Sequence, residues 1–394
     1  MTAEGRIEID IYPRAPLGHC VRIESSRPLS ITRQFTGHSP SEIAQTVALL
    51  YATCKAAQSV AAAKALEEAR GIAVPPTTSR VREMRVLAEA AREHTLRILM
   101  DWSQFLDAPQ PPPANELRAA MQAERDLARH LDEARAALRF GGTFVYESDA
   151  VENDIAACEA LLERAIFAEP LRIWRARETK DDLINWAAPR HTIAQRLFDQ
   201  IATDGLLDAG AAPVSPLPSF DRDRLAARLF DDNRAHFVAA PDWEGVPRET
   251  SPLARSIDHP LIRALETSEG FGLGARLAAC LVELANVPKR LRETVARLNG
   301  PEIAEPSRSE AMPGVGLSQV EAARGRLVHA VELAGGKVSR YRILAPTEWN
   351  FHPEGAAARG LARIARGDAH DVARIARLFV TAVDPCVGYE VRVH

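Results

Sequence analysis

The sequence places strand patterns near its two ends and a long region of helical periodicity between them. Residues 6–11 alternate apolar and charged side chains and residues 20–24 repeat this alternation, so both segments predict half-buried strands that pair. Residues 326–331 and 338–344 flank Gly335 and Gly336, which predicts a hairpin because both glycines tolerate positive φ. We therefore expect an α+β fold that is predominantly helical, with a few short strands and hairpins.

Apolar residues at steps of three and four predict the central helices. Ser39 can cap the first helix and Gly71 can end it. Its apolar stripe comprises Ile43, Val47, Leu50, Cys54 and Ala57. Further helices are predicted at residues 80–106, 115–138, 151–167, 192–202, 220–230, 276–298 and 369–382. The last helix should stop at Asp384, because Pro385 disfavours helical geometry in the residue before it.

Two proline-containing segments interrupt this pattern. Residues 109–113 predict a stiff extended spacer, with partner binding as the alternative. Residues 299–313 include three prolines and predict an exposed connection. Neither segment needs to divide the protein, so we expect a single domain over residues 1–394.

Composition indicates a globular protein with no electrostatic preference for polyanions. The chain has 394 residues, 46% of them hydrophobic, and carries 49 Lys plus Arg against 53 Asp plus Glu. A formal charge of -4 gives no reason to expect nucleic acid or an anionic membrane as a partner. Residues 1–16 lack the apolar run of a secretory signal, and residues 273–287 are too few to cross a bilayer. We therefore expect a cytoplasmic protein without membrane insertion.

The five cysteines are too few and too scattered for a disulfide framework, and a cytosolic chain would keep them reduced. No CxxC pair is present, which removes the commonest sequence signal for zinc or an iron-sulfur cluster. Cys20, Cys158 and Cys280 belong to no motif, and we expect them in the core or on the surface.

Two separated segments resemble the signatures of the nickel-iron hydrogenase large-subunit family in degraded form. The family has Arg-Ile-Cys-Gly-x-Cys near its N-terminus, and residues 50–54 here read Leu-Tyr-Ala-Thr-Cys. Its C-terminal signature is Asp-Pro-Cys-x-x-Cys-x-x-His, and residues 384–389 here read Asp-Pro-Cys-Val-Gly-Tyr. Each segment keeps one thiol, Cys54 or Cys386, and has Tyr51 or Tyr389 in place of the other cysteine.

Residues 17–19, 314–329 and 345–350 also resemble family segments and occur in the family's order. With two cysteines lost, the chain is most similar to the non-catalytic hydrogenase expression/formation proteins of the HupK/HoxV type. This resemblance implies a hydrogenase-large-subunit-like fold and a protein that is not an enzyme.

The resemblance also implies which residues would meet a metal. In the family four thiolates hold nickel and iron, and Cys54 corresponds to a bridging ligand whereas Cys386 corresponds to a ligand of nickel alone. Tyr51 and Tyr389 offer phenols with an ordinary pKa of about 10, which are poor ligands for a soft metal site. We therefore expect no nickel and no catalytic residue. Two thiolates are enough to hold, transiently, one iron that already carries two cyanides and one carbon monoxide, the Fe(CN)2(CO) unit.

Three further residues are implied as contacts of that unit. Arg324 matches the arginine that donates hydrogen bonds near the diatomic ligands, Asp384 matches the carboxylate of the second signature, and Glu93 keeps the charge of its counterpart. Leu17 stands where the family has a glutamate that relays protons, and leucine cannot accept a proton. The sequence stops at His394, so we expect no C-terminal processing, and we assign His394 no ligand role.

Each of these residues also has a structural interpretation. A cysteine on an apolar helix face is most often a small buried hydrophobe, which applies to Cys54, and Cys386 could be an inert thiol. Arg324 could pair with Asp384 for stability alone. A disulfide between the two cysteines is disfavoured in the cytoplasm. We expect structural roles for His19, His94, His329 and Trp349.

From these observations we predict an assembly scaffold or carrier for the Fe(CN)2(CO) unit during maturation of a nickel-iron hydrogenase large subunit. Its partners would be hydrogenase maturation chaperones, iron-ligand assembly proteins and the large-subunit precursor. The alternative is a metal-free docking or chaperone protein for maturation factors, with a degenerate pocket. A divergent hydrogenase is a third class, which the missing thiolates disfavour.

Overall fold

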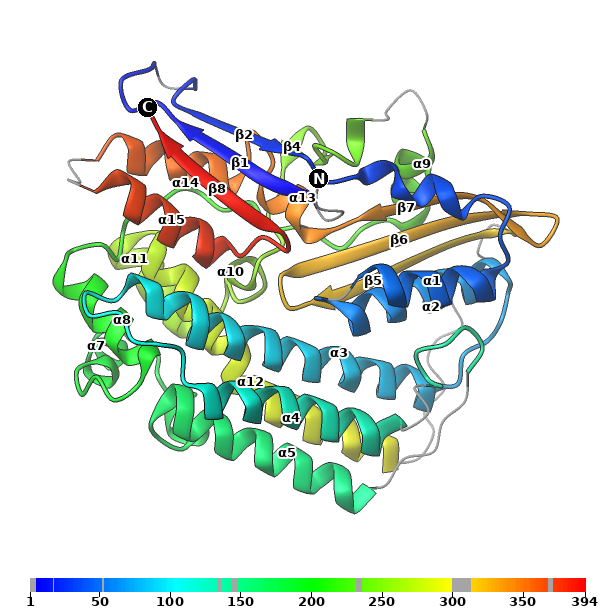
Figure 1. The fold of residues 1–394 in the computed structure, drawn as a ribbon, viewed down its shortest axis with the longest axis horizontal. Coiled ribbons are helices and arrows are strands. Elements are labelled where there is room, and N and C mark those ends of the chain that lie inside the picture. Colours follow the sequence, from blue (N-terminus) through cyan, green and yellow to red (C-terminus); the bar gives the residue numbers. More distant parts are fainter. Residues whose placement is uncertain are drawn as a thin grey trace.

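The computed structural model describes residues 5–16, 18–51, 53–132, 136–142, 148–231, 236–299, 313–367 and 371–394. Four long helices lie side by side below two three-stranded sheets (Figure 1). These helices are α3 (Pro76–Leu96), α4 (Ala114–Asp132), α5 (Ser148–Leu162) and α12 (Leu273–Asn299).

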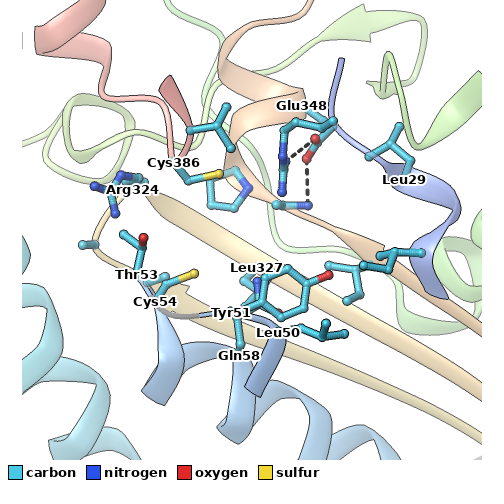
Figure 2. A pocket seen from close by; sticks show the side chains of 18 of the residues that line it. Leu29, Leu50, Tyr51, Thr53, Cys54, Gln58, Arg324, Leu327, Glu348 and Cys386 are labelled. Atoms are coloured by element: carbon cyan, nitrogen blue, oxygen red, sulfur yellow. Dashed lines mark hydrogen bonds and ion pairs between the residues drawn. The ribbon is translucent and has the colours of Figure 1, made fainter. Parts of the chain in front are cut away.

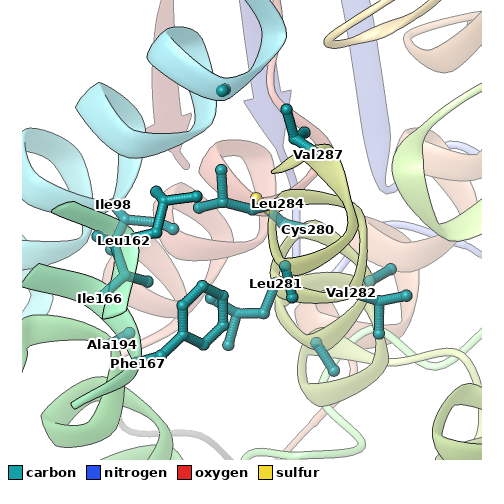
Figure 3. Packing of buried hydrophobic residues seen from close by; sticks show 14 of the residues in the cluster. Ile98, Leu162, Ile166, Phe167, Ala194, Cys280, Leu281, Val282, Leu284 and Val287 are labelled. Atoms are coloured by element: carbon teal, nitrogen blue, oxygen red, sulfur yellow. The ribbon is translucent and has the colours of Figure 1, made fainter. Parts of the chain in front are cut away.

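The largest hydrophobic core fills the space between these helices. Buried residues in the first half of α12 surround the whole helix rather than one stripe, which indicates a central position in the layer. Figure 3 shows Cys280 and Leu284 of α12 facing Ile98 and Leu162 across this core. Cys280 therefore lies in the core, one of the two locations expected from the sequence.

One face of the sheet β5-β6-β7 packs against helix α2 (Lys55–Ala69), near the N-terminus of the chain. The sheet comprises β5 (Val315–Ala322), β6 (Gly325–Ala334) and β7 (Lys337–Leu344), all antiparallel. Helix α2 lies against β5 and β6, and its many alanines allow a close approach. At Gly316 this approach leaves no room for a side chain, because a Cβ there would lie 1.8 Å from the carbonyl oxygen of Ala65.

The second sheet joins the two ends of the described chain. Strand β1 (Arg6–Ile11) pairs antiparallel with β2 (Val21–Ser25) and parallel with β8 (Gly388–Val393). The isoleucines of β1 are buried, and they belong to a hydrophobic core cluster with residues of α14 (Ala356–Ala365) and α15 (Val372–Val383). This pairing brings the segment between α15 and β8 back to the region where β2 ends (Figure 1).

The remaining elements connect these layers. Near the N-terminus lie η1 (Leu29–Phe35) and α1 (Pro40–Leu50), and α3 continues through a π-turn η2 (Arg97–Asp101) into η3 (Trp102–Phe105). The others are η4 (Glu163–Phe167), α6 (Leu171–Trp174), α7 (Lys180–Ala187), α8 (Ile193–Thr203), α9 (Arg222–Phe230), β3 (Asp242–Trp243), β4 (Val246–Pro247), α10 (Pro252–Arg255), α11 (Pro260–Glu269) and α13 (Pro346–Asn350).

The predicted fold class is confirmed, as are the paired N-terminal strands, the Gly335-Gly336 hairpin and the stop of the last helix before Pro385. Two helix predictions were wrong in extent. The helix expected over residues 39–71 is broken after Leu50, and α2 starts at Lys55. Helix α4 ends at Asp132, whose carboxylate accepts hydrogen bonds from the backbone N–H groups of Ala136 and Ala137.

Four of the described strands were not predicted: β5, β8 and the two-residue strands β3 and β4. The expected single domain stays a prediction, and most of the connection at residues 299–313 lies outside the described residues. Within the described part of the chain, no helix is both long enough and apolar enough to cross a bilayer.

Candidate functional site

A cavity of about 110 Å³ lies where the two sheets, α3 and the break between α1 and α2 meet. Cys54 and Cys386 both line it, and Figure 2 shows their sulfur atoms directed into the same space from different walls. The two thiols are free. About 10–15 Å³ of such volume admits one water molecule, so the cavity has room for a ligand of several atoms. The two cysteines that the resemblance implies as iron ligands therefore line one cavity.

Cys54 lies immediately before the first residue of α2 instead of in the middle of a continuous helix. Tyr51 ends α1 in an extended conformation, and Cys54 is the N-cap residue of the next helix. The carboxylate of Glu89 from α3 accepts hydrogen bonds from the backbone N–H groups of Ala56 (2.6 Å) and Ala57 (3.0 Å). Because these donors would otherwise be unsatisfied at a buried helix end, Glu89 stabilises the break that exposes Cys54 to the cavity.

Cys386 is held by the turn that follows α15. Asp384 ends this helix at φ 61°, a left-handed conformation that aspartate tolerates better than most residues. Beyond Pro385, the hydroxyl of Thr347 donates to the Cys386 sulfur at 2.9 Å and accepts from the Cys386 backbone N–H at 3.2 Å. Thr347 therefore fixes the position of the Cys386 thiol near the C-terminus.

The three residues predicted to contact the iron unit form one ion-pair network beside the thiols. Arg324 donates to Glu93 at 2.9 Å and to Asp384 at 3.1 Å, and all three side chains are buried. Glu93 also pairs with Arg92, and Asp384 also pairs with Arg97. Arg324 and Glu93 line the cavity, whereas Asp384 lies behind Arg324.

The backbone presents Arg324 in a tight turn between β5 and β6. Gly325 has φ 135°, and a Cβ there would lie 2.1 Å from the carbonyl oxygen of Thr250. The side-chain amide of Asn350 donates to the carbonyl of Arg324 at 3.2 Å. Glycine is thus required at this turn for both conformation and space. Glu93 and Asp384 hold the guanidinium of Arg324 in place.

A second arginine, Arg27, reaches the opposite side of the cavity from the segment after β2. It pairs with Glu348 at the start of α13, and Figure 2 shows Glu348 to the right of Cys386, on the side away from Arg324. The second carboxylate oxygen of Glu348 accepts the backbone N–H of Ala345 at 3.2 Å. This pair, like the Glu89 cap and the Thr347 bond, was not found from the sequence.

The electrostatic environment keeps the Cys54 thiol protonated at neutral pH. Burial, reinforced by the charges of Glu89 and Cys386, raises the pKa of Cys54 to about 12. Burial also raises the pKa of Glu89 to about 7, although its two backbone hydrogen bonds act in the other direction. A metal that binds Cys54 as a thiolate must therefore displace a proton.

Burial acts to lower the pKa of Arg324 and of Arg27, but the neighbouring carboxylates outweigh it and raise both values. Both guanidinium groups are therefore charged. The cavity thus combines two soft sulfur donors with two cationic hydrogen-bond donors.

The two tyrosines that replace family cysteines have different positions. Tyr51 lines the cavity, and burial raises the pKa of its phenol to about 12. The Tyr389 hydroxyl instead bonds to Thr381 (2.7 Å) and donates to the Arg377 carbonyl (3.2 Å), against α15. Neither phenol is thus a ready anionic ligand for a soft metal.

The other residues singled out in the sequence lie away from the thiols or have structural partners. His329 is buried between Tyr341 and Gln58, and burial lowers its pKa to about 3. His94 bonds to Cys280 at 3.4 Å. His394 pairs with Asp10 on the N-terminal sheet. Trp349 packs in the core, His19 is exposed, and Leu17 lies outside the described residues.

The donor set fits a soft metal fragment that brings most of its own ligands. Among the described residues, no group of three or more His, Cys, Asp or Glu side chains is placed to hold a metal ion. Two thiols in one cavity supply two soft donors, and a bare ion would need more. The absence of nickel stays a prediction.

Comparison with known proteins identifies relatives along almost the whole chain. The family described as nickel-dependent hydrogenase matches residues 272–388. The hydrogenase expression/formation protein HoxV of Cupriavidus necator is 31% identical, covering 95% of this chain and 93% of its own. The hydrogenase expression/formation protein HupK of Rhizobium leguminosarum bv. viciae is 32% identical, with coverage of 99% and 96%.

The fold has counterparts among solved structures. The Ni-Fe-Se hydrogenase of D. vulgaris Hildenborough in its as-isolated oxidized state superposes with a TM-score of 0.60 and 17% sequence identity. The superposition covers 93% of this chain and 92% of the other. At this identity the likeness establishes a shared fold.

Proposed function

Because the chain belongs to the family of hydrogenase expression/formation proteins that includes HoxV and HupK, we propose that it holds the Fe(CN)2(CO) unit during maturation of a nickel-iron hydrogenase large subunit. In this role the protein is a carrier and performs no hydrogen chemistry. The iron unit is its cargo. A cytoplasmic location, where the maturation chaperones, the iron-ligand assembly proteins and the large-subunit precursor would meet it, is part of the proposal.

The observation that carries the proposal is that Cys54 and Cys386, 332 positions apart in the sequence, line one cavity. Iron that already carries three diatomic ligands needs few further donors, and thiolates suit it. Arg324 supplies N–H donors to the cyanide ligands, and Glu93 and Asp384 hold its guanidinium in place.

The chemistry of Cys54 favours transient holding over permanent binding. Its thiol is protonated in the cavity, so cargo binding competes with a proton, and protonation of the sulfur assists release. A site with two sulfur ligands and a high thiol pKa is suited to transfer.

Infrared spectroscopy tests the proposal. Protein purified anaerobically from cells that contain the maturation machinery should show cyanide and carbonyl bands, and these bands should disappear in Cys54→Ser and in Cys386→Ser. Cys158→Ser, which removes a buried thiol of the helical core, is the matched control and should keep them. A wild-type protein that supports hydrogenase formation without such bands would exclude the carrier role.

A second candidate function, docking of maturation factors without iron, is favoured by the surface beside the cavity. Leu29 and Leu50 line the cavity and are 36% and 40% exposed, and the neighbouring Leu49 is 82% exposed. Exposed leucines grouped in this way are typical of protein contacts. Leu49→Asp should then abolish binding of a maturation factor in pull-down assays, and the two cysteine variants should retain it.

A further inference from the structure

The proposed cargo adds negative charge to a cavity that already holds carboxylates. Iron(II) carries two positive charges, and two cyanides with two thiolates carry four negative ones, so the bound unit is a dianion. Glu93 and Glu348 line the same cavity. An additional buried negative charge is strongly unfavourable unless a cation turns towards it.

Two arginines line the cavity, and they differ in how firmly they are held. Arg324 is fixed by Glu93 and Asp384, while its backbone is held in the β5–β6 turn. For Arg27, the described residues provide a single carboxylate partner, Glu348. Moving Arg27 to a new partner therefore breaks fewer ion pairs than moving Arg324.

Glu348 keeps one hydrogen-bond partner when Arg27 moves away. One of its oxygens faces Arg27, and the other accepts the Ala345 N–H. The Arg27 side chain is 12% exposed and that of Glu348 is 4% exposed, so the arginine lies nearer the solvent. Arg27 and Cys386 line the same cavity. The arginine side chain is long and has several rotatable bonds, so its guanidinium can turn from Glu348 towards a ligand on the Cys386 sulfur.

We propose that Arg27 is an exchangeable anion-binding residue that selects negatively charged cargo at the cavity. In the absence of cargo, the Glu348 carboxylate occupies the position at the Arg27 guanidinium that the anionic cargo would take. The inference rests on the proposed carrier function, and it adds a specificity element on the wall opposite Arg324. A neutral ligand cannot compete with Glu348 for the guanidinium. An anionic one can, because it also gains the sulfur contact.

Alkylation of Cys386 tests this without any iron. Iodoacetate is an anion and iodoacetamide is its neutral analogue, and with either one the thiolate sulfur forms an S–C bond and iodide leaves. The measured quantity is the ratio of the two rates at Cys386, followed by peptide mass spectrometry on the full-length protein. Intrinsic reactivity of the thiol cancels in this ratio, so the ratio reports the charge selectivity of the cavity.

Removal of the competing anion in Glu348→Gln should raise the iodoacetate to iodoacetamide ratio about tenfold, and Arg27→Gln should lower it about tenfold. Arg27→Lys should stay close to the wild type because it keeps the charge. The surface pair Arg263 and Glu266 provides matched controls, and Arg263→Gln and Glu266→Gln should leave the ratio unchanged. The double variant Arg27→Gln/Glu348→Gln guards against misfolding by an unpaired Glu348, and its ratio should lie between those of Arg27→Gln and the wild type, because it loses the cation but also the repelling carboxylate.

Equal ratios in wild type, Glu348→Gln and Arg27→Gln would overturn the inference and leave the carrier proposal to its infrared test. Charge-selective alkylation in a protein that never shows cyanide or carbonyl bands would retain Arg27 as an anion-binding residue and reject the iron cargo. The two ideas therefore fail separately.

Discussion

Two buried ion-pair clusters, one on each half of α3, have the same chemistry but differ in their position relative to the cavity. In the first half, Arg82 and Glu67 form a bidentate pair at 2.6 and 2.7 Å with side chains 1% and 2% exposed. Backbone groups satisfy the remaining atoms: the carbonyls of Ala137 and Arg139 accept from Arg82, and the Gly141 N–H donates to Glu67. We call this cluster closed, because its charged groups and the neighbouring backbone groups satisfy one another's hydrogen bonds.

The second cluster, around Arg324, is open in the sense that it borders the cavity and includes buried donors for which the described part of the chain provides no partner. It lines the cavity with Glu93, and it continues outward through Arg92 and Arg97. Among the described residues, the Nε atoms of Arg92 and Arg97 are buried without a hydrogen-bond partner. The Arg324 cluster thus borders the cavity and keeps these buried donors without a described partner, whereas Arg82 is hydrogen-bonded at Nε and at both terminal nitrogens.

The largest effect is expected in the closed cluster. Glu67→Gln should lower the free energy of unfolding by about 3–5 kcal/mol, because it leaves Arg82 as a buried charge for which the described part of the chain provides no second carboxylate partner. Urea denaturation measures this. Glu293→Gln, in the exposed pair with Lys289, is the control and should change stability by less than about 0.5 kcal/mol. A loss below about 1 kcal/mol would mean that the cluster is not closed.

The Glu89 cap should give stability a pH dependence. Its pKa is about 7 in the folded protein and 4.5 in the reference state, so the folded state binds more protons between these values. Stability from this group is present below pH 4.5 and is lost as the pH rises to about 7, for a total of about 3 kcal/mol. Denaturation of wild type and Glu89→Gln from pH 4.5 to 8 measures the difference. Parallel pH profiles would contradict the assignment.

Arg324→Gln should cost less stability than Glu67→Gln, about 1–2 kcal/mol, although Arg324 is also buried. The reason is that each carboxylate it leaves behind retains a second arginine, Arg92 for Glu93 and Arg97 for Asp384. Denaturation of the two variants side by side checks the comparison. If both lose the same amount, the distinction between open and closed clusters is wrong.

The smallest effect is expected at Thr347, which holds Cys386 through its hydroxyl. Thr347→Val keeps the shape but removes this bond and the acceptor for the Cys386 N–H, and should cost about 1 kcal/mol. Thr267→Val, whose hydroxyl bonds to a carbonyl at the exposed surface of α11, is the control and should lose less than about 0.5 kcal/mol. An equal loss in both variants would contradict a special role for Thr347 in holding the thiol.

Local sequence patterns were sufficient for elements whose partners are near in the chain. Period-two alternation predicted β1 and β2, and the glycine pair predicted the β6–β7 hairpin. Strand β8 carries a similar alternation, yet it pairs in parallel with β1 from the other end of the chain, and no local signal marks such a partner. The family resemblance, drawn from two degraded motifs, is confirmed by relatives that match almost the whole chain.

The candidate site was predictable only where a motif named its residues. Cys54, Cys386, Arg324, Glu93 and Asp384 came from the resemblance, and the structure brings all five together. Apolar periodicity continues through residues 51–54, so the helix break that frees Cys54 was invisible. Its cause is a carboxylate 33 positions away, and Arg27 and Glu348 are 321 positions apart. Contacts of this kind depend on the tertiary fold alone.

The most direct test of the carrier claim is iron K-edge X-ray absorption on protein loaded in cells with the maturation machinery. If Cys54 and Cys386 hold one iron between them, the spectrum of the wild type contains two sulfur neighbours per iron at about 2.3 Å, and Cys54→Ser or Cys386→Ser leaves at most one. Iron without sulfur neighbours, or iron retained at the same stoichiometry in the Cys54→Ser/Cys386→Ser double variant, would contradict the account.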